Sequence, residues 1–342
     1  MNQELVTVPI SLVPVLAFLG LLFFMDSFKL LRVSSVLRAV GAGAAVAAFC
    51  YLASEQILAH TSISTETYRR YVAPCLEEVL KTSYLVFLIR TSRVGFLVDA
   101  AISGFAVGTG FALVENVTYL FSVSSAGVLV WLVRGLGTAI MHGSTGAVFA
   151  MLGMSLSERH PRAGLLAFLP GFLVAFTVHS AFNHFALHPF VSTALLLVLL
   201  PLLVVFVFER SERATREWLG VGFDTDVELL ELLDGNMAES KVGQHLEAMK
   251  ERLPPQVVGD LLCLLRIHLE LSVRAKGILL ARAAGVRLPL DALVKANLEE
   301  LEYLNESVGR TGRLALSPFL NMKRRELWQL YMLSEAGKSE PE

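Results

Sequence analysis

Two adjacent glutamates and a lysine lie in an otherwise apolar stretch, Pro74 to Lys81, which reads Pro-Cys-Leu-Glu-Glu-Val-Leu-Lys. An ionisable side chain at membrane depth costs about 2.5 to 3.5 kcal/mol on insertion scales, so it is retained mainly where it functions or pairs with another group. Glu77 and Glu78 therefore mark a candidate site. On a helix, Lys81 lies within reach of both carboxylates, because it follows them by four and three residues.

Further polar residues fall in other apolar stretches: Glu115, His142, His179 and Asn183. His179 and Asn183 are four residues apart, so they share one face of a helix. A histidine in that position can relay a proton, and an amide one turn away can donate to a developing oxyanion. The alternative for this pair is a polar contact that only joins two helices.

The elements that must position these residues are membrane helices. The chain has 342 residues, of which 54% are hydrophobic and 18% charged. A transmembrane helix needs about 20 apolar residues to cross about 30 Å of hydrocarbon. Stretches that approach this length are residues 7–25, 36–53, 72–89, 97–120, 128–156, 164–186 and 190–208. The predicted fold class is all-α, a bundle of about seven transmembrane helices with a C-terminal helical soluble domain.

Charged residues are much more frequent after residue 208 than before it. Of the 31 acidic residues 22, and of the 29 basic residues 18, follow that point. We predict a transmembrane domain over residues 1–208 and a soluble helical domain over 209–342. The second region shows no catalytic or metal-ligand spacing, and we interpret it as a site for a cytoplasmic partner. The net charge of −2 argues against a nucleic-acid partner. Three cysteines, two of them in apolar stretches, imply no disulfide framework.

Basic residues in the loops predict the orientation in the cell membrane, since cytoplasmic loops carry an excess of lysine and arginine. The loops assigned to the cytoplasm contain Lys29, Arg32, Arg38, Arg90, Arg93, Arg159 and Arg162. This places the N-terminus outside and the C-terminal domain in the cytoplasm. At 1.5 Å per residue, Glu78, Glu115 and His179 then lie about 8 to 10 Å below the outer surface, with His142 at a similar level. The polar groups are therefore expected to share one layer.

Short motifs on successive apolar stretches resemble those of the PrsW family of intramembrane proteases. Glu77 to Lys81 is similar to its EExxK motif, and Glu115-Asn116 with Tyr119 to the end of its GFAxxENxxY segment. His142 to Gly146 matches HxxxG, and His179 to Asn183 matches HxxxN. The resemblance covers about residues 70 to 190.

The resemblance implies a relation to the CAAX-processing and bacteriocin-processing endopeptidases. It also implies a membrane enzyme that cuts peptide bonds, with family members cleaving a membrane-anchored anti-sigma factor from the outer side. In the wider group, a glutamate and histidines activate water and an asparagine supports the oxyanion. That group has histidine where this chain has Glu115, so no role is carried over to Glu115.

We interpret the chain as an intramembrane endopeptidase of the glutamate type that uses no cofactor and acts on a membrane-anchored protein. Glu77, assisted by Glu78, would deprotonate a water molecule that attacks the scissile carbonyl. His179 and His142 would position that water and transfer protons, and Asn183 would donate to the oxyanion. The reaction requires a polar cavity open to the outer face.

Two alternatives remain open. In a metalloprotease, zinc would be bound by Glu78 or Glu115 together with His142 and His179, because zinc accepts such nitrogen and oxygen donors. The sequence contains no HExxH motif. In a transporter or non-catalytic scaffold, the buried groups would relay protons or bind a partner helix, but the internal repeats common in transporters are not evident.

Overall fold

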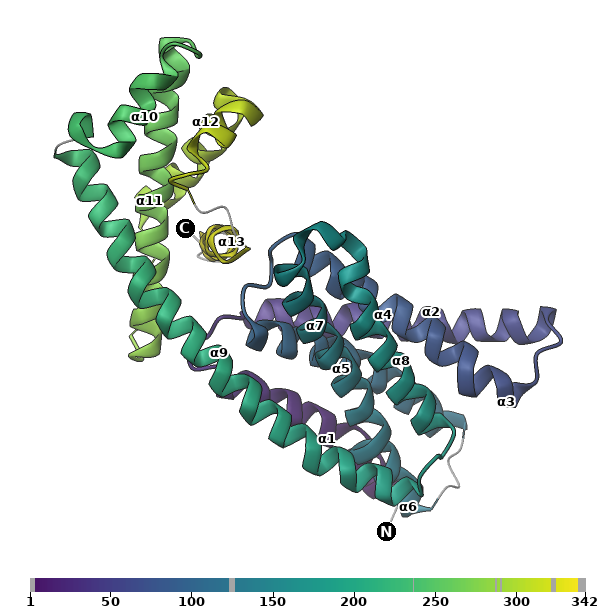
Figure 1. Cartoon of the computed structure of the whole chain (residues 1–342). Coiled ribbons are helices and arrows are strands. Elements are labelled where there is room, and N and C mark those ends of the chain that lie inside the picture. The colour runs from purple at the N-terminus through teal and green to yellow at the C-terminus, as the bar shows by residue number, and fades with distance from the viewer. Residues whose placement is uncertain are drawn as a thin grey trace. The chain divides into compact units, whose positions relative to one another are not determined.

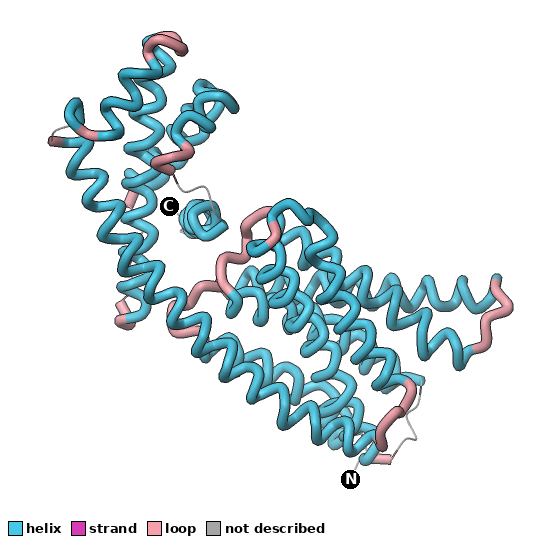
Figure 2. Tube along the Cα trace, in the orientation of Figure 1, coloured by secondary structure: helices cyan, strands magenta, loops and turns pink. Residues whose placement is uncertain are grey.

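The computed structural model describes residues 4–122, 127–235, 237–286, 288–289, 291–320 and 324–337. Every regular element in these ranges is a helix, and Figure 2 draws helices joined by loops without a strand among them. This confirms the predicted all-α fold class. The chain divides into two compact units, Met1–Ser211 and Glu212–Glu342.

The first unit contains the helices that carry the candidate site residues (Figure 1). In chain order these are α1 (Glu4–Met25), α2 (Val33–His60), α3 (Thr65–Thr67), η1 (Tyr68–Val72), α4 (Ala73–Arg90), α5 (Leu97–Ser122), α6 (Val128–Leu132), η2 (Val133–Thr138), α7 (Ala139–Arg159), η3 (Pro161–Phe168), α8 (Leu169–Asn183) and the first part of α9 (Pro189–Asp234). Segments η1 and η2 are π-helical, and η3 is a 3₁₀ helix.

Six described segments are long and apolar enough to cross a membrane: Val6–Met25, Val33–His60, Leu97–Ser122, Val128–Arg159, Pro161–Asn183 and Pro189–Asp234. Each overlaps one of the predicted spans. The remaining predicted span, residues 72–89, corresponds to α4. Four charged side chains interrupt the apolar sequence of α4, and they include the two glutamates and the lysine of the candidate site.

Helix α5 forms the centre of the first unit, and its side chains are buried from Val98 to Ala112. It lies against α7 on one side and α2 on another (Figure 1). Glycine allows the close approach to α7, because a Cβ atom at Gly108 would overlap the backbone carbonyl of His142. A Cβ at Gly104 would likewise overlap the carbonyl of Gly146. Small residues thus let the backbones meet directly beside His142.

Helix α9 is longer than its predicted apolar span, since it runs for 46 residues from Pro189 to Asp234. It therefore continues without a break through the point where the charge composition changes, and its last part belongs to the second unit. The rest of the second unit consists of η4 (Met237–Glu239), α10 (Lys241–Met249), α11 (Pro255–Ala283), α12 (Ala292–Leu316) and α13 (Arg324–Gly337).

The second unit has an apolar core along α11, where Leu261, Leu265 and Leu279 are fully buried. A buried lysine of α11 forms an ion pair with α9, with Lys276 Nζ at 2.6 Å from the partly buried Asp226 Oδ2. His268 is also buried, and its burial lowers the pKa of the imidazole to about 4. The histidine is therefore neutral at pH 7 and packs as part of the core.

The contact between Gly108 and His142 predicts a large difference between two glycine substitutions. Gly108→Ala should lower the free energy of unfolding by about 1 to 3 kcal/mol, because the backbone carbonyl that it meets cannot change rotamer. Gly41→Ala in α2 is the matched control, since no atom lies within 4 Å of its new Cβ. Thermal unfolding in detergent micelles, followed by circular dichroism, compares them. Equal melting temperatures would contradict the packing described here.

Candidate active site

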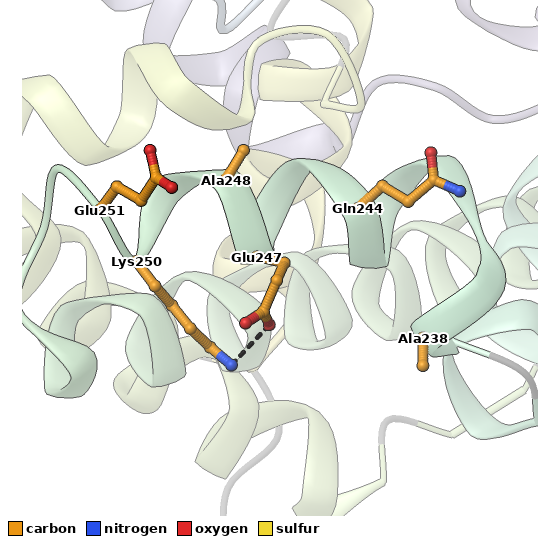
Figure 3. Close-up of a pocket in the computed structure, with 6 residues that line it drawn as sticks. All are labelled: Ala238, Gln244, Glu247, Ala248, Lys250 and Glu251. Carbon is orange, nitrogen blue, oxygen red and sulfur yellow. Dashed lines mark ion pairs between the residues drawn. The ribbon is translucent and has the colours of Figure 1, made fainter.

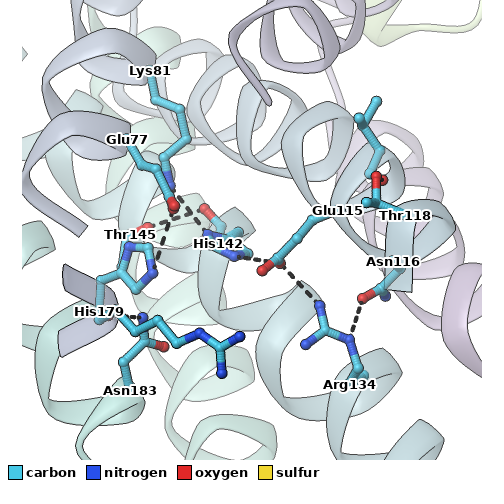
Figure 4. A network of polar contacts seen from close by, with 12 residues as sticks. Glu77, Lys81, Glu115, Asn116, Thr118, Arg134, His142, Thr145, His179 and Asn183 are labelled. Atoms are coloured by element: carbon cyan, nitrogen blue, oxygen red, sulfur yellow. Dashed lines mark hydrogen bonds and ion pairs between the residues drawn. The ribbon is translucent and has the colours of Figure 1, made fainter. Parts of the chain in front are cut away.

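Four helices bring the predicted site residues together in the first unit (Figure 4). They are α4 with Glu77 and Glu78, α5 with Glu115, α7 with His142, and α8 with His179. The rings of the two histidines pack edge to face, with centroids 4.7 Å apart. The groups that the sequence placed in one layer are thus in direct contact.

Glu78 is completely buried and holds both Lys81 and His179. Its Oε1 atom accepts hydrogen bonds from Lys81 Nζ at 2.6 Å and from His179 Nδ1 at 2.8 Å. Thr145 Oγ1 donates to the same oxygen at 3.4 Å. Because a carboxylate only accepts, the proton of His179 must be on Nδ1. Its Nε2 atom therefore presents a lone pair to the centre of the site.

In His142 the proton is on Nε2, whereas in His179 it is on Nδ1. The Nε2 atom of His142 lies 3.1 Å from Glu115 Oε2, so this nitrogen carries the proton and donates it to the carboxylate. Its Nδ1 atom lies 3.2 Å from Lys81 Nζ, and the ammonium group donates to the lone pair there. Both nitrogens of His142 are therefore engaged, whereas His179 has one nitrogen available.

Glu77 is the carboxylate of the site that has no fixed cation. Glu78 pairs with Lys81, and Glu115 pairs with Arg134 at 3.2 Å. For Glu77, no lysine or arginine partner occurs among the described residues, and its Oε2 atom lies 3.7 Å from His179 Nε2. The side chain of Glu77 is 17% exposed. A charged carboxylate in such a position requires a proton or a cation.

Glu77, His142 and His179 are also the group that the geometry favours for a metal ion. One ligand atom from each of these residues lies within 4.8 Å of the others. The alternative zinc ligands expected from the sequence were Glu78 or Glu115 with the same histidines. The structure groups Glu77 with the histidines instead. The other two carboxylates are paired with Lys81 and Arg134.

Arg134 belongs to the site and was missed by the sequence analysis. Its guanidinium group pairs with Glu115 and donates a hydrogen bond from Nε to Asn116 Oδ1 at 3.0 Å. The same group lies over the ring of Tyr119, 3.6 Å from the centroid. The Glu-Asn-x-x-Tyr sequence on α5 thus forms a cradle for one arginine of η2. An arginine within a predicted span was the signal that could have identified it.

The π-helical turn η2 brings Arg134 and His142 towards one face. The two residues are eight positions apart, which on a regular α-helix corresponds to about 80° beyond two full turns. A π-helical turn is wider and rotates the chain less per residue, so it reduces this offset. Segment η1 occupies the equivalent place before α4, and π turns are frequent at functional sites.

Asn183 lies on α8 near His179 (Figure 4), but its amide has a backbone partner. Nδ2 donates to the carbonyl of Arg69 at 3.0 Å, and Ser180 Oγ donates to the carbonyl of Arg70 at 2.6 Å. These bonds join α8 to η1. One of the two amide protons is committed in this way, and the oxyanion role of Asn183 stays a prediction.

A separate pocket lies on α10 of the second unit (Figure 3). It is lined by Ala238, Gln244, Glu247, Ala248, Lys250 and Glu251. Lys250 and Glu247 form an ion pair there, and both side chains are more than half exposed. The lining contains neither histidine nor cysteine and provides no catalytic group comparable to those on α4, α7 and α8.

Comparison with known families identifies the chain. The family model described as PrsW family intramembrane metalloprotease matches residues 32–208, which is more than half of the sequence. The chain belongs to the PrsW family. The predicted family is thereby confirmed, and the matched range includes every predicted site residue from Glu77 to Asn183.

Membership of the PrsW family makes the chain an intramembrane protease, and its apolar helices make it a multi-pass membrane protein. Its substrate is accordingly a membrane protein. No curated protein and no solved structure matched the chain in the other two comparisons. Residues after 208 lie outside the family match.

The Arg134 cradle predicts that this arginine stabilises the fold more than a surface arginine does. Arg134→Gln should lower the free energy of unfolding by about 1 to 3 kcal/mol, because it leaves Glu115 without its cation in a largely buried position. Arg70→Gln is the control, since its ion pair with Glu66 is exposed and should contribute less than about 1 kcal/mol. Denaturant titration in mixed micelles measures both. Similar losses for the two variants would argue against the cradle.

Proposed function

We propose that the chain hydrolyses a peptide bond of a membrane-anchored protein at the site formed by Glu77, His142 and His179. The observation that carries the proposal is that Glu77 lies beside two imidazoles and pairs with no lysine or arginine of the described ranges. A carboxylate in this position can bind a metal ion or accept a proton from water. The other two glutamates are neutralised by Lys81 and Arg134 and are less available for either role.

We propose further that these three residues hold a divalent metal ion such as zinc. Two histidines and one glutamate are an established ligand set for catalytic zinc, and the family description names a metalloprotease. Glu78 fits the set as the carboxylate that orients a ligand histidine through its second nitrogen. Such an ion supplies Lewis acidity, which polarises a carbonyl group and makes water a stronger nucleophile at neutral pH.

The protein groups around the ligands have separate tasks. Glu78 keeps the proton of His179 on Nδ1, so that Nε2 stays available. Arg134 holds Glu115, which in turn orients His142 through Nε2. The second N–H of the Asn183 amide is proposed to donate a hydrogen bond to the oxyanion that forms on the scissile carbonyl.

The glutamate-type mechanism is the second candidate. The observation in its favour is that Lys81 already uses the Nδ1 lone pair of His142. In this mechanism Glu77 takes a proton from water, the water oxygen attacks the carbonyl carbon, and the proton passes to the leaving amine through His179 Nε2. A transporter or scaffold, the third candidate, would release no peptide product.

The predicted membrane orientation and the family motifs suggest the domain roles, the depth of cleavage and the substrate. We propose that residues 1–208 form the protease domain and that residues 209–342 form a cytoplasmic helical domain that binds a partner. Cleavage would occur near the outer face of the cell membrane, about 8 to 10 Å below its surface. The family resemblance makes an anti-sigma factor with a single membrane anchor the substrate to look for.

Replacing Glu77 should abolish cleavage without removing the protein from the membrane. In Glu77→Gln cells a single-pass membrane protein should accumulate uncut, because the amide neither binds a metal as tightly nor accepts the proton of water. Quantitative proteomics of membranes from wild-type and variant cells measures this. Glu66→Gln is the matched control, since that side chain is 67% exposed and pairs with Arg70 rather than with a residue of the site. If the identified substrate is still cut by the Glu77→Gln enzyme, Glu77 has no part in the mechanism.

Chelation separates the two candidate mechanisms. The purified protein should contain about one metal ion per chain, and a chelator should remove metal and activity together. Elemental analysis before and after chelation, with cleavage of the identified substrate measured in parallel, tests this. Full activity of the metal-free protein would exclude the metal and leave the glutamate-type mechanism.

A further inference from the structure

Lys81 is a buried cation held between three helices at the site. Its side chain is fully buried, and Nζ lies 2.6 Å from Glu78 Oε1 and 3.2 Å from His142 Nδ1. The same ammonium group lies over the ring of Phe111, 4.7 Å from the centroid. Lys81 therefore contacts α7 and α5 from its own position on α4.

The contact with His142 conflicts with metal binding, whichever ring nitrogen would be the ligand. A neutral imidazole has one lone pair and one N–H group. If the metal bound Nδ1, it would need the lone pair to which Lys81 donates. If it bound Nε2, the proton would move to Nδ1 and point at the Lys81 ammonium, which has only donors. His179 has no such conflict, because its proton already faces Glu78.

We propose that Lys81 and the metal ion compete for the single lone pair of His142. Lys81 lowers the metal affinity of the site, and it must release His142 before all three ligands can bind the ion. This inference rests on the proposed metal site. Lys81 is thus a positioning residue that sets when His142 is available as a ligand.

The structure also provides a place for the displaced ammonium group. Glu78 Oε2 is buried and has no hydrogen-bond partner among the described residues. A small movement of Lys81 Nζ from His142 towards this oxygen would keep the charge paired with Glu78. The movement therefore need not expose either charge to the apolar surroundings, where an unpaired ion is costly.

Titration with Zn²⁺ alone tests the competition without a substrate. The full-length chain is purified in detergent micelles, stripped of metal, and titrated against a chromophoric chelator. The variant Lys81→Met should bind Zn²⁺ about ten to a hundred times more tightly than the wild type, because a hydrogen bond from a charged donor no longer competes. General damage to the site would lower the affinity instead.

Two further comparisons control the experiment. Lys276→Met removes another buried lysine, paired with Asp226 at the same distance of 2.6 Å in the second unit, and should leave Zn²⁺ affinity unchanged. If Lys81→Met does not fold, the double variant Lys81→Met/Glu78→Gln removes both charges together. It should bind Zn²⁺ about tenfold more tightly than Glu78→Gln alone, in which Lys81 remains beside His142.

The outcomes distinguish this inference from the proposed function. If the wild type binds one Zn²⁺ that Glu77→Gln loses, but the Lys81 variants bind no more tightly, only the competition is refuted. If neither the wild type nor the Lys81 variants bind Zn²⁺, the metal site and the competition are both refuted. Tight binding that appears only when Lys81 is replaced would support both.

Discussion

The site depends on an imbalance between buried carboxylates and fixed cations. Glu77, Glu78 and Glu115 meet two basic side chains, Lys81 and Arg134. Within the described part of the chain, this pairing leaves Glu77 without a lysine or arginine partner. In an apolar surrounding such a group attracts a proton or a metal ion. The chemistry proposed for the protein follows from this remaining charge, and the paired carboxylates serve to orient the two histidines.

The packing of the helices maintains this arrangement. Gly108 allows α5 to approach the backbone of α7 at His142, so Glu115 and His142 come within hydrogen-bond distance. The π-helical turn η2 adjusts the position of Arg134 relative to His142 on the same continuous helix. Bonds from Ser180 and Asn183 to the carbonyls of η1 join α8 to the beginning of α4. The candidate site residues on α5, α7 and α8 are thus held by contacts outside their own helices.

Much of the site could be predicted from the sequence, because polar residues in apolar stretches are expensive and therefore informative. Glu78, Glu115, His142 and His179 were expected in one layer, and the structure brings them into contact. The pairing of carboxylates with cations could not be predicted. Adjacent glutamates point about 100° apart on a helix, and the rotation of that helix is determined by tertiary packing.

Three other features of the structure could not be predicted from sequence patterns. The cradle of Arg134 depends on a π turn, which changes the register of side chains without a clear signature. The partner of the Asn183 side chain is the backbone carbonyl of Arg69. Every residue has such a carbonyl, so the sequence gives no signal for this hydrogen bond. The length of α9 exceeded the predicted span because helix-forming charged residues continue the helix beyond its apolar part.

Glu77, His142 and His179 converge on one point of the first unit. X-ray absorption spectroscopy at the zinc edge, on protein loaded with one Zn²⁺ per chain, tests it most directly. We expect a first coordination shell with two imidazole nitrogens and carboxylate oxygen, and the loss of that carboxylate's oxygen contribution in Glu77→Gln. A shell with fewer than two imidazoles, or one that contains sulfur, would contradict it.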